Sequence, residues 1–195
     1  MNRAEAIDAV AKARANAAVI TGPGANSGLL FERGDAPATI YNMDMGYATA
    51  VALGIALACP RRRVLAIEGE GSFHAGATVL STIWRLKPDN LVVLILDNGV
   101  WGTGDGLEPT ATAFGLDLVR LAKANGWDDK NVQHTAAADE LGHMLVAALR
   151  GGGPHFIVGK TVVDPDESSS SGRPRPQRHL LDCAVFMRAE LGGDA

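Results

Sequence analysis

Residues 64–73 read VLAIEGEGSF and residues 91–99 read LVVLILDNG, and these two stretches carry the strongest pattern in the chain. Each opens with a continuous run of aliphatic residues and ends in a turn that contains glycine. Between them, residues 73–85 have the spacing of a helix, which Pro88 closes. Aliphatic strands joined through a helix are typical of a parallel sheet that is buried on both faces.

The same alternation of strands and helices extends outward from this centre. We expect strands at residues 18–21, 39–41, around 132 and at 155–163, and helices at 4–18, 47–58, 117–125, 138–150 and 180–191. The helix at 47–58 contains almost only small and aliphatic residues, so it is predicted to be buried on every side. The prediction is an α/β fold of three layers, a parallel sheet with helices on both faces, formed by residues 1–195 as a single domain. Residues 164–178 are expected to be a mobile loop before a C-terminal helix within 179–195.

Composition and charge exclude several classes of protein. The 195 residues are 47% hydrophobic and 21% charged, with a mean hydropathy of +0.06, as in globular rather than disordered or fibrous chains. A formal net charge of -4 argues against general binding of nucleic acid. Cys59 and Cys183 lie far apart and predict neither a zinc site nor a disulfide framework. We expect a cytoplasmic protein with no membrane partner, because no segment resembles a signal peptide or a membrane span.

Four turns that contain glycine follow predicted strands, at residues 22–28, 42–46, 69–72 and 98–106. Ligands of open parallel sheets bind outside the carboxyl ends of the strands. Glycine lets backbone amides approach an anion closely, and the start of a following helix adds positive potential. The turns therefore predict a binding site for a diphosphate.

A diphosphate usually binds together with Mg²⁺, which prefers oxygen ligands in octahedral geometry. Glu70 follows one predicted strand, and Asn98 follows the next strand 28 positions later. A right-handed crossover brings these strand ends to the same edge of the sheet, where the carbonyl of Val100 is a third candidate ligand. Gly69 and Gly71 alone indicate only a tight turn, but Glu70 and Asn98 together favour a metal site.

Other residues near these turns have alternative interpretations. The turn Gly22–Gly28 is one residue longer than a dinucleotide fingerprint and lacks the later acidic residue, so NAD binding is the weaker reading. His74 is interpreted equally well as a cofactor contact or a structural histidine. Trp101 shapes either the substrate pocket or a subunit interface. Asp97 and Asp105 are interpreted as groups that cap loops.

The turns at 69–72 and 96–99 together resemble the signature of thiamine-diphosphate enzymes, a Gly-Asp-Gly followed after a little under thirty residues by Asn. Residues 2–6, 42–48, 54–58, 98–104 and 172–174 are similar to one branch of that family, the phosphonopyruvate and sulfopyruvate decarboxylases. The resemblance covers nearly the whole chain. It implies the diphosphate-binding module of the family, with thiamine diphosphate and Mg²⁺ as cofactors.

The resemblance also implies roles for individual residues. Glu70, Asn98 and the carbonyl of Val100 would bind Mg²⁺. Met43 would offer its backbone carbonyl to the aminopyrimidine, and Met45 would hold the cofactor bent, so that its exocyclic nitrogen faces the reactive carbon. The other expected cofactor-binding residues are Gly22, Gly24, Asn26, Ser27, Gly69, Gly71, Ser72, Asn98, Val100, Trp101 and Gly102.

The chain departs from the family pattern in three ways. Glu70 stands where the family usually has the shorter Asp, and Asp97 replaces the first residue of an Asn pair. The family's catalytic glutamate lies on a pyrimidine-binding domain, for which these 195 residues leave no room. The resemblance therefore implies a hetero-oligomer with a separate pyrimidine-binding subunit that carries this glutamate, docked near the helix at 47–58. We expect homodimers when the chain is made alone.

The predicted function is that of one subunit of a thiamine-diphosphate-dependent carboxy-lyase. Such an enzyme would convert a small anionic 2-oxoacid, which in this family is sulfopyruvate or phosphonopyruvate, to an aldehyde and CO₂. One alternative is a carboligase subunit resembling the acetolactate synthases. Another is a non-catalytic or regulatory subunit that retains the fold, for which Glu70 in place of Asp is the only support in the sequence.

Overall fold

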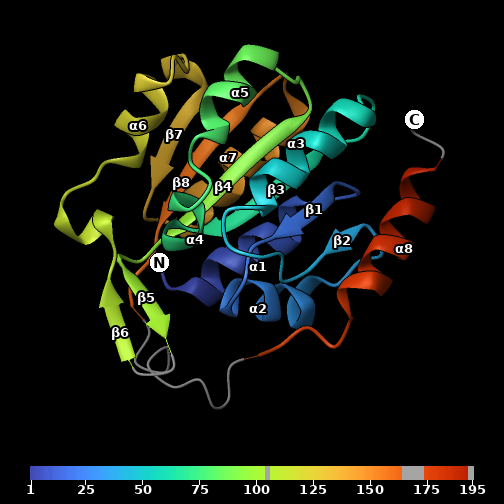
Figure 1. The fold of residues 1–195 in the computed structure, drawn as a ribbon, viewed down its shortest axis with the longest axis horizontal. Coiled ribbons are helices and arrows are strands. Elements are labelled where there is room, and N and C mark those ends of the chain that lie inside the picture. Colours follow the sequence, from blue (N-terminus) through green and yellow to red (C-terminus); the bar gives the residue numbers. More distant parts are fainter. Residues whose placement is uncertain (104–105, 164–173, 193–195) are drawn as a thin grey trace.

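The computed structural model describes residues 1–103, 106–163 and 174–192 (Figure 1). The predicted mobile loop at 164–178 falls largely on residues 164–173, which lie outside the described residues. Asp105 and the last three residues of the expected C-terminal segment, 193–195, also lie outside them.

Six parallel strands form the central sheet, in the order β2-β1-β3-β4-β8-β7. The strands are β1 (Ala18–Thr21), β2 (Thr39–Ile40), β3 (Val64–Gly69), β4 (Leu91–Asp97), β7 (Val132–Thr135) and β8 (His155–Lys160). The aliphatic runs at the centre pair in register, from Val64 opposite Leu91 to Gly69 opposite Leu96. All residues of β1 and β4 are buried, so the prediction of a parallel sheet covered on both faces is confirmed.

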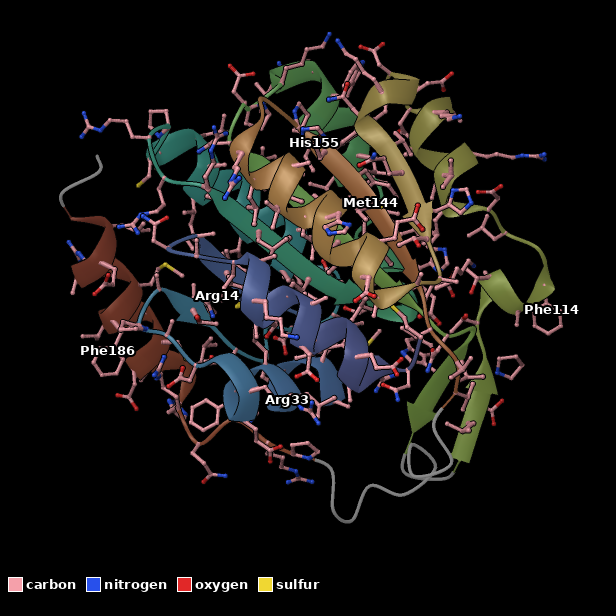
Figure 2. All side chains as sticks on the ribbon, turned by 180° about the vertical axis from the view of Figure 1, so that it is seen from behind. Arg14, Arg33, Phe114, Met144, His155 and Phe186 are labelled. Carbon is pink, nitrogen blue, oxygen red and sulfur yellow. The ribbon has the colours of Figure 1, made fainter. Side chains whose placement is uncertain are left out.

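Helices cover both faces of this sheet. They are α1 (Arg3–Ala13), α2 (Ala25–Gly34), α3 (Ala48–Ala58), α4 (Glu70–His74), α5 (Val79–Leu86), α6 (Leu118–Ala124), α7 (Ala138–Arg150) and α8 (Leu180–Leu191), with short 3₁₀ turns η1 (Ala111–Phe114) and η2 (Asp129–Asn131). Seen from behind, α1 and α7 lie side by side across one face (Figure 2), and α3 lies on the other face (Figure 1). No helix in the described ranges is long and apolar enough to cross a membrane.

Several segments differ from the prediction. The glycine turn after β1 ends earlier than expected because α2 begins at Ala25, and this helix was not predicted. The helix predicted at 73–85 is divided into α4 and α5. A Cβ at Gly76, in the break between them, would lie 2.2 Å from the carbonyl oxygen of Gly46, so this turn requires glycine. The loop predicted at 98–106 forms instead a hairpin of β5 (Val100–Thr103) and β6 (Gly106–Pro109).

The prediction that α3 is buried on every side is wrong for the isolated chain. One face, which includes Thr49 and Leu53, packs on the sheet. On the outer face Tyr47 is 61% exposed and Leu57 is 48% exposed, and a Cβ at Gly54 would meet nothing within 4 Å. The helix is apolar all round, yet none of the residues that the structure describes covers its outer face.

The order of the strands places a crevice at the carboxyl edge of the sheet. From β1 the chain moves outward to β2 on one side, and from β3 it moves to β4 on the other. The turns that follow β1 and β3 therefore diverge. A reversal of this kind is the usual place for a ligand in an open α/β sheet.

Candidate cofactor site

A cavity of about 240 Å³ opens at this reversal. It is lined by Arg3, Pro23, Gly24, Ala25, Asn26, Met45, Gly69, Glu70, Gly71, Ser72, Asn98, Val100, Trp101 and Gly102. The structure thus brings together most of the predicted site residues from four separate turns. The cavity is smaller than the roughly 300–1,000 Å³ of pockets that enclose a whole ligand.

Three predicted residues, Gly22, Ser27 and Met43, lie beside the cavity and do not line it. A Cβ at Gly22 would approach the Oγ of Ser72 to 3.2 Å, so the turn after β1 lies against α4. The Ser27 hydroxyl accepts a hydrogen bond of 2.9 Å from Thr21 Oγ1, and the Met43 amide donates one of 2.9 Å to the Thr21 carbonyl. These contacts hold the turns after β1 and β2 together.

Among the described residues that line the cavity, only Glu70 supplies a carboxylate. Its side chain is 2% exposed, and its Oε1 accepts a hydrogen bond of 2.9 Å from Thr110 Oγ1. Burial raises the pKa of the Glu70 carboxyl; the Thr110 hydrogen bond opposes this rise, and the charge of Asp97 adds to it. A bound cation would favour the ionised form of this carboxyl.

Asn98 and Val100 line the same cavity as Glu70 and lie where the chain leaves β4. Asn98 Oδ1 accepts a hydrogen bond of 3.2 Å from the Val100 amide, which folds the start of β5 over the asparagine. In the described part of the chain, no three His, Cys, Asp or Glu side chains converge to hold a metal. A metal here would take one carboxylate, an amide oxygen and a carbonyl, and would need further oxygens from its ligand.

The side chain of Asn26 bears on whether the cavity fits a diphosphate bound with Mg²⁺. It is 5% exposed, and its Oδ1 has no hydrogen-bond partner among the described residues. A buried polar atom without a partner costs about 1–3 kcal/mol. Its Nδ2 lies 3.9 Å from the position of a Cβ on Gly69, so the amide faces the turn that carries Glu70. Water on a bound cation would donate to this oxygen, and the Asn26 Nδ2 could donate to a diphosphate oxygen, so the side chain fits a diphosphate bound with hydrated Mg²⁺.

Trp101 partly covers the cavity from the β5–β6 hairpin. A Cβ at Gly71 would lie 2.9 Å from Trp101 Nε1 and 3.1 Å from its Cδ1, so the indole lies directly on the Gly71 backbone. The tryptophan remains 44% exposed. The absence of a side chain at Gly71 therefore allows Trp101 to reach the turn predicted to bind the diphosphate.

Glu68 is a buried residue that the sequence interpretation missed. It is 1% exposed; its Oε1 accepts hydrogen bonds from the amide and hydroxyl of Thr49 at 2.9 and 2.7 Å. Its Oε2 accepts one of 2.7 Å from Ser72 Oγ, which in turn accepts one of 3.3 Å from the Gly46 amide. One carboxylate therefore connects α3, α4 and the turn that carries Met45. The signal in the sequence was an acid at the end of an otherwise aliphatic strand.

Asp97 is confirmed as a capping group. Its Oδ1 accepts hydrogen bonds from the Gly99 amide at 3.1 Å and from Thr112 Oγ1 at 2.8 Å, and its Oδ2 forms an ion pair with Lys160. His74 does not line the cavity. Burial lowers the pKa of the His74 imidazole, and the charge of Asp97 opposes this shift.

An open parallel sheet with glycine turns, a carboxylate and amide oxygens at its switch point defines a diphosphate-binding α/β domain. The chain belongs to the thiamine pyrophosphate enzymes, because residues 33–158 match the model of their C-terminal TPP binding domain. The resemblance seen in the sequence is thereby confirmed.

Two relatives and one solved structure agree with this assignment. The chain is 35% identical over 164 residues to a phosphonopyruvate decarboxylase of Streptomyces hygroscopicus, covering 84% of this chain and 39% of that protein. It is 30% identical over 149 residues to the sulfopyruvate decarboxylase subunit beta of Methanothermobacter thermautotrophicus, covering 71% of this chain and 77% of that protein. The thiamine diphosphate-dependent 4-hydroxybenzoylformate decarboxylase of Rhodococcus jostii RHA1 shares the fold, with a TM-score of 0.67 and 24% identity over 84% of this chain and 33% of that one. The chain spans only about two-fifths of the length of the phosphonopyruvate decarboxylase.

Proposed function

We propose that this chain is the thiamine-diphosphate- and Mg²⁺-binding subunit of a 2-oxoacid decarboxylase of the sulfopyruvate or phosphonopyruvate type. Together with a partner subunit, it would convert the 2-oxoacid to an aldehyde and CO₂. The observation that carries the proposal is the meeting of Glu70 and Asn98 in one cavity, beside the buried Asn26 oxygen, for which no described residue is a hydrogen-bond partner.

In this proposal, different residues of the cavity bind the metal, the diphosphate and the rest of the cofactor. Glu70, Asn98 Oδ1 and the Val100 carbonyl hold Mg²⁺, and the backbone of the turns at 22–27 and 69–72 holds the diphosphate. Met45, which lines the cavity and is 37% exposed, would support the bound cofactor. Bound thiamine diphosphate supplies an electron sink for the charge left when a 2-oxoacid loses CO₂. The residues of this chain bind and orient it.

A separate pyrimidine-binding subunit would complete the site. The cavity is small, and the uncovered apolar face of α3 begins directly after the turn that carries Met45. A subunit docked on Tyr47 and Leu57 would therefore also reach the cavity. The relative from Methanothermobacter is itself named as a beta subunit, which agrees with a partner of another kind.

Calorimetric titration of thiamine diphosphate into the purified chain tests this proposal. We expect binding in Mg²⁺ that is abolished by EDTA and by Glu70→Ala, with Glu32→Ala, an exposed glutamate, as the matched control. Full affinity of Glu70→Ala would remove the metal assignment. Binding of NAD in place of thiamine diphosphate would contradict the proposal, as would a complex with a pyrimidine-binding subunit that binds no cofactor.

A further inference from the structure

Arg3 adds a basic residue to the lining of the cavity from outside the four glycine turns. It is half-buried and lines the cavity together with Asn98, Trp101 and Gly102. Among the lining residues in the described part of the chain, Arg3 is the only basic one and Glu70 the only acidic one. A guanidinium is no ligand for a cation, but it donates charge-assisted hydrogen bonds to anionic groups.

The backbone of Arg3 is fixed, although it lies near the start of the sequence. The Met1 ammonium donates a hydrogen bond of 2.6 Å to the Ala136 carbonyl, and the Val162 amide donates one of 3.0 Å to the Met1 carbonyl. Asn2 and Glu5 form a reciprocal capping box, with both hydrogen bonds at 2.8 Å. Arg3 is therefore held at the first position of α1, and little ordering is needed when a ligand arrives.

These anchors place Arg3 on a defined side of the cavity. Val162 follows β8 and Ala136 follows β7, whereas Met45 follows β2 at the other end of the sheet order. The cavity thus has Met45 towards one side and Arg3 with the β5–β6 hairpin towards the other. Planar guanidinium groups bind phosphate, phosphonate, sulfonate and carboxylate groups through two parallel hydrogen bonds.

We propose that Arg3 is an oxyanion-binding residue of this cavity, an inference that rests on the proposed function. Two groups could supply this oxyanion: the diphosphate of the cofactor, or the phosphonate or sulfonate group of the 2-oxoacid. In either case Arg3 offsets the negative charge that a diphosphate and Glu70 bring into one small cavity.

Calorimetry with three probes tests this role and separates the two sources. The probes are thiamine diphosphate with Mg²⁺, inorganic pyrophosphate with Mg²⁺, and sulfoacetate, which carries a sulfonate and no diphosphate. The variants are Arg3→Gln and Arg3→Lys, and the control is Arg120→Gln, whose side chain is 87% exposed on α6. Thermal unfolding of each variant shows whether its fold is intact.

We expect Arg3→Gln to raise a dissociation constant by about tenfold or more, as for the loss of a charge-assisted hydrogen bond, with Arg3→Lys intermediate. If Arg3→Gln binds only thiamine diphosphate and pyrophosphate more weakly, Arg3 contacts the diphosphate of the cofactor. If it binds only sulfoacetate more weakly, Arg3 contacts the anionic group of the substrate. Equal affinities in Arg3→Gln and Arg120→Gln for all three probes would overturn the inference, as would a wild-type chain that binds none of them. A wild-type chain that binds pyrophosphate or sulfoacetate through Arg3, but no thiamine diphosphate, would instead contradict the proposed function.

Discussion

The hydroxyl of Thr110 donates a hydrogen bond of 2.9 Å to the carboxylate of Glu70, forty residues earlier in the chain. Glu70 has one methylene more than the aspartate usual in the family, so its carboxylate has more rotational freedom to lose. Thr110 is 6% exposed and follows the β5–β6 hairpin. It fixes one carboxylate oxygen before any metal arrives.

Replacement of Thr110 by valine tests this contact. We expect Thr110→Val to weaken Mg²⁺-dependent binding of thiamine diphosphate several-fold and to lower the free energy of unfolding by about 1 kcal/mol. Calorimetry and urea unfolding measure the two effects. Thr135→Val is the matched control, because the buried Thr135 hydroxyl also donates to a glutamate, Glu140, but outside the cavity. Equal cofactor affinities in the two variants would contradict a positioning role for Thr110.

Glu70→Gln is expected to stabilise the metal-free protein while it weakens cofactor binding. Burial raises the pKa of Glu70 above its ordinary value of 4.5, so the ionised carboxyl disfavours the folded state. This penalty is present above the folded pKa and absent below 4.5. In urea unfolding, the glutamine variant should be the more stable protein at pH 7, and the difference should vanish near pH 4. A wild-type protein that is the more stable at pH 7 would contradict this prediction.

Gly71→Ala should displace Trp101. The new Cβ would lie 2.9 Å from the indole nitrogen, so the tryptophan must move towards solvent. We expect a red shift of tryptophan emission and a loss of cofactor affinity, whereas Trp84 and Trp127, which stack on each other, provide a constant background. Gly54→Ala is the control, since its Cβ meets nothing within 4 Å; it should stabilise α3 by up to about 1 kcal/mol. Unchanged emission in Gly71→Ala would show that the indole does not rest on this glycine.

Leu57→Arg should prevent association through α3. The residue is 48% exposed on the uncovered apolar face, so the change costs the folded chain little but places a charge in the proposed interface. Analytical ultracentrifugation of the isolated chain should show weaker dimerisation than in the wild type. Phe114→Arg is the control, because Phe114 is 79% exposed on η1, far from α3 (Figure 2). Loss of association in the control alone would place the interface elsewhere.

The sequence predicts the sheet and the metal candidates because both depend on local patterns. Aliphatic strands and regular connections are enough to place Glu70 and Asn98 together, and α7 and α8 begin and end at the expected residues. The hairpin at 100–109 was missed because its glycines and short strands look like a loop. Contacts made across the fold were also missed, since no local pattern reports that Thr110 meets Glu70 or that Arg3 enters the cavity.

The hydrogen bonds of Glu68 should couple the motions of the three segments that they join beside the cavity. Thr49, Ser72 and Gly46 lie on three separate segments, yet all depend directly or through one hydroxyl on the same buried carboxylate. A local opening that exposes one of these segments must break bonds shared with the others. Their backbone amides should therefore exchange with solvent deuterium at similar rates, and a ligand that orders any one segment should slow exchange in all three.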